Sequence, residues 1–354
     1  MTVKLTKNIT IPVIICLMIM MIVGYAAFRP TNSAKKAEAS VPAPVAQATD
    51  LLDRVTRFTS EFGVRGGYRT PTEAERSAVL AGISSLLDGD VEKGRTRLAG
   101  VDYRLDTFTD GPGGRRYAEV ADAAARSGSA NRGWGRVYVD LGAPVRWSVQ
   151  VPHPIADQDT ERLGVAVLRG TPGGVMVLAG AHRKAAGGPG GGDGEGEEGD
   201  GAGDANAAGA GAGSGGGGGG GTGEADMAHR TDSVFHAVIA ELTRRGLPGI
   251  QLHGFADSTV PGAGAVVSTG AGDAAAADAA RLADELASRG VRPCRAWSTG
   301  CRMSGRGNAQ GRLAAELATR FLHLELARSV RADPGRRDEV ARAIAYVTAG
   351  WAGA

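Results

Sequence analysis

The stretch VRWSVQVPHPIADQDTERLG, residues 145–164, places a histidine between a strand pattern and a helix pattern. Its first seven residues are rich in β-forming side chains and predict a strand. The residues from TERLG onward have helical spacing. His153 stands at the junction, and Asp157, Asp159 and Glu161 follow it. Because sites in open α/β sheets form outside the carboxyl ends of strands, this junction is a candidate site.

Strand and helix patterns alternate through residues 131–350. Strands are predicted at GRVYVDL, VRWSVQV, GVMVLAG, GIQLHGF, GAVVSTG and RFLHLEL. Helices are predicted at TERLGVAVLRG, DSVFHAVIAELTRRG, DAAAADAARLADELASRG and the closing ARSVRADPGRRDEVARAIAYVTAG. This alternation predicts an α/β domain in which a mixed sheet carries helices on both faces.

The N-terminal residues 1–30 have the pattern of a membrane anchor or an export signal. Lys4 and Lys7 precede residues 9–28, which contain no charged side chain. About 20 apolar residues span a bilayer as a helix, and basic residues before such a run favour a cytoplasmic N-terminus. We therefore expect a transmembrane helix and a membrane-anchored, extracytoplasmic protein. A cleaved signal peptide, which would give a secreted protein, is the alternative.

Three other segments have distinct compositions. Residues 31–48 are typical of a solvated tether. Residues 49–130 show apolar side chains at helical spacing and predict a small helical region, with Thr72 as an N-cap. Residues 187–224 are mostly Gly and Ala, with seven acidic residues and no Lys or Arg, and predict a disordered insertion. The GAGAGSG within this insertion follows no strand, so it does not indicate dinucleotide binding.

Charge and cysteine content narrow the functional classes. The formal net charge of the 354-residue chain is +2, which gives no electrostatic reason to expect nucleic-acid binding. Cys294 and Cys301 in PCRAWSTGC suggest a disulfide if the domain is extracytoplasmic. A zinc-binding pair is the alternative, although metal-binding cysteines usually stand closer together. No GxSxG motif occurs, so a nucleophile-elbow serine hydrolase lacks its main sequence signal.

Three of the six histidines, His153, His182 and His253, fall at or just after the ends of predicted strands. A catalytic zinc ion takes three protein ligands and keeps one position open. His153 and an adjacent carboxylate offer two such ligands, and His253 in QLHGF offers the third. A hydrogen-bonded structural histidine at each position is the alternative.

Glu325 lies in FLHLELARSVR, a strand pattern otherwise made of Leu and Phe with one His. Alternation places His323 and Glu325 on one face of that strand and the leucines on the other. A carboxylate on an apolar strand is costly unless it has a partner. Glu325 is therefore either the proton acceptor of a hydrolytic reaction or the partner of Arg328 or Arg331 in a salt bridge.

These motifs resemble those of the phage and bacillar poly-γ-glutamate hydrolases, zinc enzymes with a carboxypeptidase-like fold. HPIADQDTE is similar to the family pattern HGGxIExGTSE in His153, Asp157 and Glu161. QLHGF resembles the later SIHG, and FLHLELARSVR resembles the closing GVQLELSRxLR. RGNAQGR, residues 306–312, stands where the family has an Asn-containing segment. The resemblance covers residues 150–331 outside the Gly-rich insertion.

The resemblance implies that His153, Asp157 and His253 bind Zn²⁺ and that Glu325 is the general base and acid. The paired glycines of the family are absent here, and the acid is an Asp placed one position earlier. Glu161 is therefore the alternative metal ligand. Candidate substrate-binding residues are His182, Arg183, His229, Arg230 and Arg328. The first four flank the insertion, where they either bind a substrate carboxylate or stabilise the base of the loop.

The sequence thus predicts a zinc carboxypeptidase- or amidohydrolase-like protein that is membrane-anchored and extracytoplasmic. Its expected reaction is the hydrolysis of an amide or peptide bond in γ-glutamyl or related anionic peptide substrates. The alternative is a non-catalytic envelope binding protein that keeps the same fold without metal.

Overall fold

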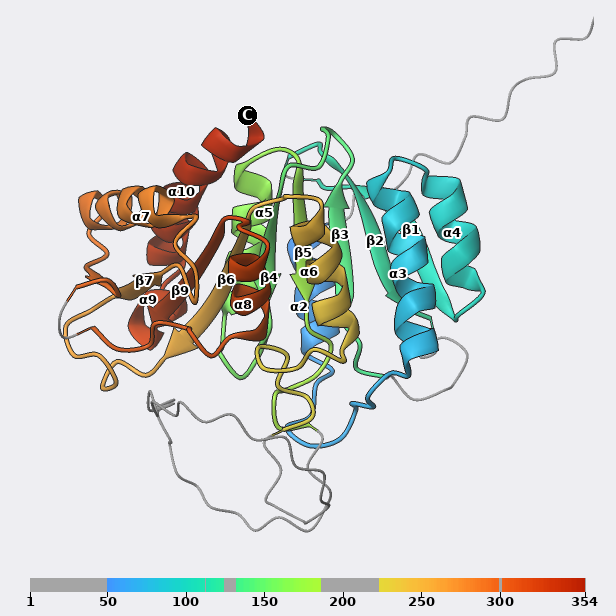
Figure 1. The fold of residues 1–354 in the computed structure, drawn as a ribbon, viewed down its shortest axis with the longest axis horizontal. Coiled ribbons are helices and arrows are strands. Elements are labelled where there is room, and N and C mark those ends of the chain that lie inside the picture. The colour runs from blue at the N-terminus through green and yellow to red at the C-terminus, as the bar shows by residue number, and fades with distance from the viewer. Residues whose placement is uncertain (1–49, 112, 124–131, 186–222, 299–300, 354) are drawn as a thin grey trace, which may run out of the picture. The chain divides into compact units, whose positions relative to one another are not determined.

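One sheet of nine strands organises the described residues, with the strand order β1-β2-β3-β5-β4-β6-β9-β7-β8 (Figure 1). The structure is a computed structural model that describes residues 50–111, 113–123, 132–185, 223–298 and 301–353. The strands are β1 (Tyr103–Thr109), β2 (Arg116–Asp122), β3 (Arg136–Asp140), β4 (Trp147–Val151), β5 (Gly174–Leu178), β6 (Gly249–Phe255), β7 (Ala265–Ser268), β8 (Pro293–Arg295) and β9 (Phe321–Ala327).

The sheet is mixed, as the sequence predicts. β5, β4, β6 and β9 are parallel neighbours. β1, β2, β3 and β5 pair antiparallel, and β7 pairs antiparallel with β9. Every residue of β4, β5 and β9 is buried, because helices cover both faces of these central strands.

Two groups of helices cover the two faces, and each group shares an apolar core with the sheet. On one face lie α2 (Leu51–Thr59), α5 (Thr160–Gly170), α7 (Ala276–Ser288), α9 (Arg328–Ala332) and α10 (Pro334–Ala352). On the other lie α3 (Glu73–Leu87), α4 (Val91–Ala99) and α6 (Val234–Arg244), and α8 (Ala309–Glu316) packs beside α6. The predicted α/β architecture with helices on both faces is confirmed.

Two helix boundaries follow directly from the sequence. Thr72 caps α3 as predicted, and its side chain and that of Glu75 form a reciprocal capping box. Gly246, the last residue of the predicted helix segment DSVFHAVIAELTRRG, has a φ of 73° and follows the end of α6. Local side-chain chemistry therefore fixes where these helices begin and end.

The predicted helical region at residues 49–130 is wrong in its second half. β1 and β2 occupy residues 103–122 and extend the main sheet through β3. The burial pattern of β1 does not alternate strictly, since Tyr103, Leu105 and Phe108 are buried, so pairing with β2 rather than the pattern defines this strand. Neither β8 nor α8 was predicted from the sequence.

Several predicted segments lie outside the described residues: the anchor or signal at 1–30, the tether at 31–48, and all but the last two residues of the insertion at 187–224. Among the described residues, no helix combines the length and the apolar character that a membrane span requires.

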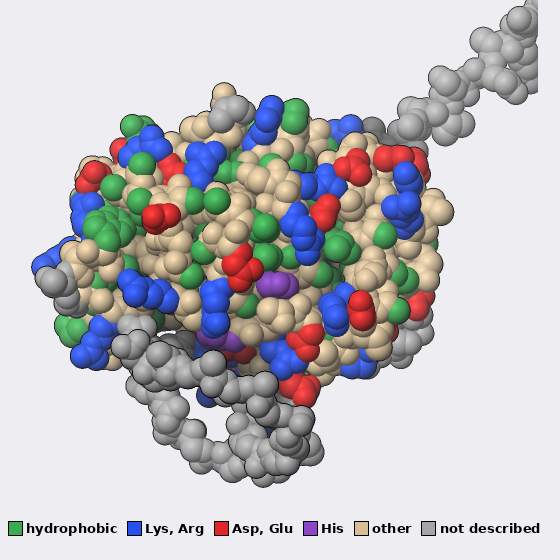
Figure 2. Space-filling model, in the orientation of Figure 1, with side chains coloured by type: hydrophobic (Ala, Val, Ile, Leu, Met, Phe, Trp, Pro, Cys, Tyr) green, Lys and Arg blue, Asp and Glu red, His purple; other side chains and the backbone are tan. Residues whose placement is uncertain are grey.

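On the face shown in Figure 2, acidic and basic side chains are interspersed, without a large area of one sign.

Strand register gathers polar side chains on the face covered by α6 and α8. β6 pairs with β9 so that Gln251 lies beside His323 and His253 lies beside Glu325. β4 places Gln150 beside Gln251. Alternation sends the neighbouring residues of these strands into the opposite, apolar core. The sheet therefore presents a row of buried polar groups near its carboxyl ends.

Candidate metal centre

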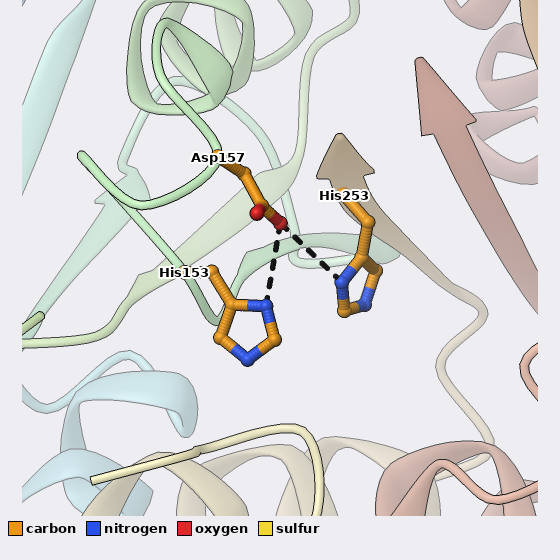
Figure 3. A group of neighbouring side chains, drawn as sticks. All are labelled: His153, Asp157 and His253. Carbon is orange, nitrogen blue, oxygen red and sulfur yellow. Dashed lines mark hydrogen bonds and ion pairs between the residues drawn. The ribbon is translucent and has the colours of Figure 1, made fainter. Parts of the chain in front are cut away.

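His153, Asp157 and His253 converge at the carboxyl end of β4 and β6. Nδ1 of His153 is 3.3 Å from Oδ2 of Asp157, and Nδ1 of His253 is 3.6 Å from the same oxygen (Figure 3). One potential donor atom from each of the three residues lies within 4.8 Å of the others. All three side chains are buried. Two imidazole nitrogens and one carboxylate oxygen form a donor set that zinc commonly uses.

The loop between β4 and α5 holds the carboxylate of Asp157 in place through an unusual backbone. Ile155 and Asp159 have φ angles of 70° and 73°, a region that few non-glycine residues adopt and that the β-branched Ile155 adopts least readily. The amide of Asp157 donates to the carbonyl of His153 at 2.9 Å. The amide of Gly254 donates to Oδ2 of Asp157 at 3.1 Å. Strained backbone of this kind concentrates at functional sites.

Each histidine also has an acceptor at its second ring nitrogen. Nε2 of His153 lies 2.8 Å from Oδ1 of Asp226, and Nε2 of His253 lies 2.7 Å from Oε1 of Gln251. An acceptor at Nε2 favours a proton on that nitrogen, and Nδ1 of each ring faces Asp157. Two ring nitrogens and one carboxylate oxygen therefore point at one position, which either a proton or a bound cation can occupy.

Charge around His153 supports the same conclusion. Burial opposes the charged form of His153, but hydrogen bonds to Asp157 and Asp226 outweigh it and raise the pKa of the imidazole to about 10. Burial opposes ionisation of Asp157, yet His153 and His253 hold its pKa well below the ordinary range. Burial lowers the pKa of His253, so His253 is neutral near pH 7. The centre thus carries an excess of negative charge that a proton or a metal cation neutralises.

Asp226 was not predicted from the sequence. It lies between the insertion and α6, in a segment without strand or helix pattern. Its Oδ2 is 3.2 Å from Nδ1 of His229, and its Oδ1 also accepts from the amide of Ala228. Contact with His153 spans 73 positions of sequence, so only the folded chain shows that Asp226 belongs to the site.

Glu325 and His323 extend the group of titratable side chains along β9. Both are buried, and Nε2 of His323 is 3.8 Å from Oε1 of Glu325. The centroids of the His323 and His253 rings are 4.5 Å apart. Burial holds the pKa of His323 well below its usual range, so this side chain is neutral. His253, His323 and Glu325 also form a second set of potential metal donors within 4.8 Å.

The two arginines after Glu325 make contacts elsewhere. Nη1 of Arg328 is 2.8 Å from Oδ2 of Asp159. The guanidinium of Arg331 donates to the carbonyls of Leu326, Gln158 and Phe255. Arg331 therefore ties the ends of β6 and β9 to the loop that carries Asp157.

A cavity of about 190 Å³ opens over the centre. It is lined by His153, Arg183, Ala228, His229, His253, residues 303–308, His323 and Glu325. Two arginines, Arg183 and Arg306, are among the lining residues, together with His229. A second cavity of about 550 Å³ adjoins it and shares Ser304 and Arg306 in its lining. The site is thus a polar cleft with cationic side chains at its wall.

The candidate substrate-binding residues separate into two groups. Arg183 and His229 line the cavity over the centre. The lining residues described for this cavity include neither His182, Arg230 nor Arg328. Nδ1 of His182 accepts from the amide of Lys184, and Arg230 forms an ion pair with Asp232. The loop segment 303–308 lines the cavity as well, although the sequence does not predict this. The segment overlaps RGNAQGR, whose asparagine the family resemblance includes.

Cys294 and Cys301 form a disulfide in the structure. The bond closes the segment that carries Ala296 and Trp297, and these two residues line the larger cavity. Cross-linking a segment in this way restricts its conformations. The disulfide therefore helps to fix one wall of the cleft.

Glu161 does not join the two donor sets found among the described residues. It lies in the first turn of α5, is 4% exposed, and its Oε2 has no hydrogen-bond partner. Burial raises the pKa of this carboxyl group. The structure therefore brings Asp157, rather than Glu161, to the two histidines.

Glu161→Gln is expected to stabilise the protein at pH 8. A raised folded-state pKa favours folding below the ordinary carboxyl range, and this contribution is lost as the pH rises through the folded pKa. The neutral amide of the variant does not ionise and so avoids this destabilisation. The free energy of unfolding of the variant should therefore exceed that of the wild type by about 1 kcal/mol at pH 8. Near pH 4 the variant and the wild type should be equally stable. Denaturant titration of both proteins at pH 4 and pH 8 measures these free energies. An equal increase in the stability of the variant at both pH values would contradict the prediction.

Comparisons with known proteins give similarity in fold alone. No protein-family model matches the chain, and no curated protein matches it. Among solved structures, a bacteriophage poly-γ-glutamate hydrolase is 12% identical with a TM-score of 0.38, over 65% of this chain and 95% of that one. An N-formylglutamate amidohydrolase from Ralstonia eutropha JMP134 is 14% identical with a TM-score of 0.35, over 60% of this chain and 95% of that one.

A third match is a putative carboxypeptidase A from Shewanella denitrificans OS-217, 12% identical with a TM-score of 0.34, over 79% of this chain and 69% of that one. The chain resembles these hydrolases. The expected resemblance to poly-γ-glutamate hydrolase is therefore found among solved structures. At these TM-scores and identities the likeness supports no conclusion about activity, which depends on the site itself.

Proposed function

We propose that the protein is a zinc-dependent hydrolase of amide or peptide bonds. The observation that carries the proposal is the convergence of two ring nitrogens and one carboxylate oxygen at the centre. Nδ1 of His153 and Nδ1 of His253 both face Oδ2 of Asp157, while both Nε2 atoms have acceptors. Histidine ligands of zinc typically donate their second N–H to an acceptor in this way.

The donor set fits a catalytic zinc ion better than a structural one. Three protein ligands leave a position open for water or substrate, whereas structural zinc is usually closed by four ligands. His153, Asp157 and His253 would hold the ion, and the cavity over them gives access to it. When bound, zinc supplies Lewis acidity that polarises a substrate carbonyl and makes water more acidic.

Glu325 is the group of this chain that moves the proton. Glu325 lines the cavity and lies on the strand next to that of His253. There it accepts a proton from the attacking water and delivers that proton to the leaving amine. Neutral His323 lies against both His253 and Glu325.

Anionic peptides are the substrate class that the cleft fits best. Arg183 and Arg306 line the cavity, and arginine side chains bind carboxylates through paired hydrogen bonds. The larger adjoining cavity, which shares Arg306, has room for the chain beyond the bond that is cleaved. We therefore propose γ-glutamyl or related acidic peptides as substrates.

The proposed place of action is outside the cytoplasmic membrane. It rests on the uncharged run at residues 9–28 after Lys4 and Lys7. The disulfide between Cys294 and Cys301 agrees with an oxidising compartment. An N-terminal anchor and a cleaved signal both lead to this location.

An assay on peptide series tests the proposal. The full-length protein is incubated with a γ-linked glutamate oligomer, an α-linked glutamate oligomer and a neutral peptide, and released amines are measured. We expect cleavage of the γ-linked oligomer, loss of cleavage after chelation, and its return on addition of zinc. A protein that holds zinc and cleaves none of the three would contradict the proposed reaction. A protein that binds the acidic oligomer without metal and without cleavage would instead be the envelope binding protein.

A further inference from the structure

Four amide side chains form a buried hydrogen-bonded network behind His253. Gln150 lies in β4, Gln251 in β6, Asn308 caps α8, and Gln310 lies in the first turn of α8. None is more than 3% exposed. Buried amides are costly unless their hydrogen bonds are made, so the partners of each group determine its orientation.

Backbone groups fix the direction of the network at two ends. Nε2 of Gln310 donates to the carbonyl of Met227 at 3.0 Å, so Oε1 of Gln310 is its acceptor side. Oδ1 of Asn308 accepts from the amide of Gly311 at 2.9 Å, so Nδ2 of Asn308 is its donor side. A backbone carbonyl only accepts and a backbone N–H only donates. Neither Gln310 nor Asn308 can therefore reverse without losing a bond.

The orientation of Gln251 follows from these two neighbours. Its Nε2 donates to Oε1 of Gln310 at 3.2 Å and to Oε1 of Gln150 at 3.0 Å. Its Oε1 accepts from Nδ2 of Asn308. This oxygen also lies 2.7 Å from Nε2 of His253. At this distance the ring nitrogen must donate, because two lone pairs would repel each other.

We infer that Gln251 is a positioning residue that holds the proton of His253 on Nε2 and keeps its Nδ1 lone pair directed at the metal site. The inference rests on the proposed function for the use of that lone pair, and on the hydrogen-bond directions alone for the tautomer. Nδ1 lies 3.6 Å from Asp157, farther than Nε2 lies from Gln251, so the amide determines where the single proton stays. Outer-shell partners of this kind change metal affinity about 10- to 100-fold.

The tautomer can be measured directly in the metal-free protein. The six histidines are labelled with ¹⁵N, and the His253 signals are identified as those missing in His253→Asn. We expect a protonated, pyrrole-type Nε2 and an unprotonated, pyridine-type Nδ1 at neutral pH. A proton on Nδ1 in the wild type would overturn the inference. This readout needs neither bound metal nor activity, so a failed hydrolysis assay leaves it standing.

Two variants at Gln251 separate positioning from simple packing. Gln251→Glu keeps an acceptor for Nε2 of His253, but it removes the donor to Gln150 and Gln310 and places a carboxylate in the core. Gln251→Leu keeps the volume and removes both the acceptor and the donor. We expect Zn²⁺ to bind Gln251→Leu about 10- to 100-fold more weakly than wild type, and Gln251→Glu nearly as tightly as wild type. Packing alone predicts the reverse order, since a buried charge costs more than a buried leucine. Equal affinity in wild type and Gln251→Leu, or weaker binding by Gln251→Glu than by Gln251→Leu, would overturn the inference.

Thermal unfolding of each variant accompanies the Zn²⁺ titration, so that affinities are compared only between folded proteins. If Gln251→Leu does not fold, the wild-type tautomer and the zinc affinity of Gln251→Glu still decide the question. A Gln251→Glu protein that folds and shifts the His253 proton to Nδ1 would contradict the inference.

Discussion

Glu325→Gln is expected to keep the fold and the bound zinc while turnover falls by a factor of about 10² to 10⁴. The amide has the shape of the carboxylate but cannot accept the proton of the attacking water. Glu325 is not among the three residues that we propose as metal ligands, so zinc content should be unchanged. Zinc content, melting temperature and turnover measured on one sample test all three expectations together.

The opposite outcome would assign Glu325 a different role. If this residue mainly stabilised β9, the Gln variant would melt at a lower temperature and keep most of its activity per folded molecule. If it were a metal ligand through the second donor set with His253 and His323, the variant would lose zinc together with activity. Glu316→Gln, an exposed acidic position at the end of α8, serves as the control for a change of charge alone.

Asp157→Asn is expected to lower zinc affinity by more than about 10²-fold. Loss of an outer-shell partner alone costs up to about 100-fold, and this change removes the charge of a proposed ligand. The amide of Gly254 can still donate to the Asn oxygen, so the loop should keep its conformation. Turnover at limiting zinc should fall in parallel with affinity.

Glu161→Gln is the matched control for this prediction, because Glu161 is the alternative ligand that the sequence left open. Like Asp157, it is a buried carboxyl group, and it lies in the first turn of α5, just after the loop that carries Asp157. It lies outside both donor sets of the described residues. Its zinc affinity should equal that of the wild type. Loss of zinc from Glu161→Gln together with retention by Asp157→Asn would reverse the assignment of the ligand.

Much of the fold could be predicted because the central strands are short apolar runs bounded by helices with clear stops. His153 and His253 were recognisable because strand ends of an α/β sheet meet at one edge. Glu325 was recognisable because alternation puts a carboxylate on a buried strand. Each of these inferences needs only local pattern and a general rule of sheet geometry.

The remaining parts depend on contacts between distant segments. Asp226 reaches His153 from beyond the Gly-rich insertion, and no local pattern marks it as a partner. From the sequence alone, Gln251 is an ordinary polar residue in a strand. Its role follows only from the fold, in which α8 places Asn308 in hydrogen-bond contact with it. The sequence predicts helix where β1 and β2 form, because short and weakly amphipathic segments are compatible with both the helical and the strand period. Tertiary pairing with β3 determines their conformation.

Zinc stoichiometry tests the central claim most directly. The full-length protein is purified, incubated with zinc and freed of unbound metal, and metal per chain is measured by mass spectrometry for the wild type, His153→Ala and His182→Ala. His182 lies outside both donor sets of the described residues and serves as the matched histidine control. We expect about one zinc ion per chain in the wild type and in His182→Ala, and close to none in His153→Ala. A wild type without bound zinc, or equal zinc in all three proteins, would contradict a metal centre at His153, Asp157 and His253.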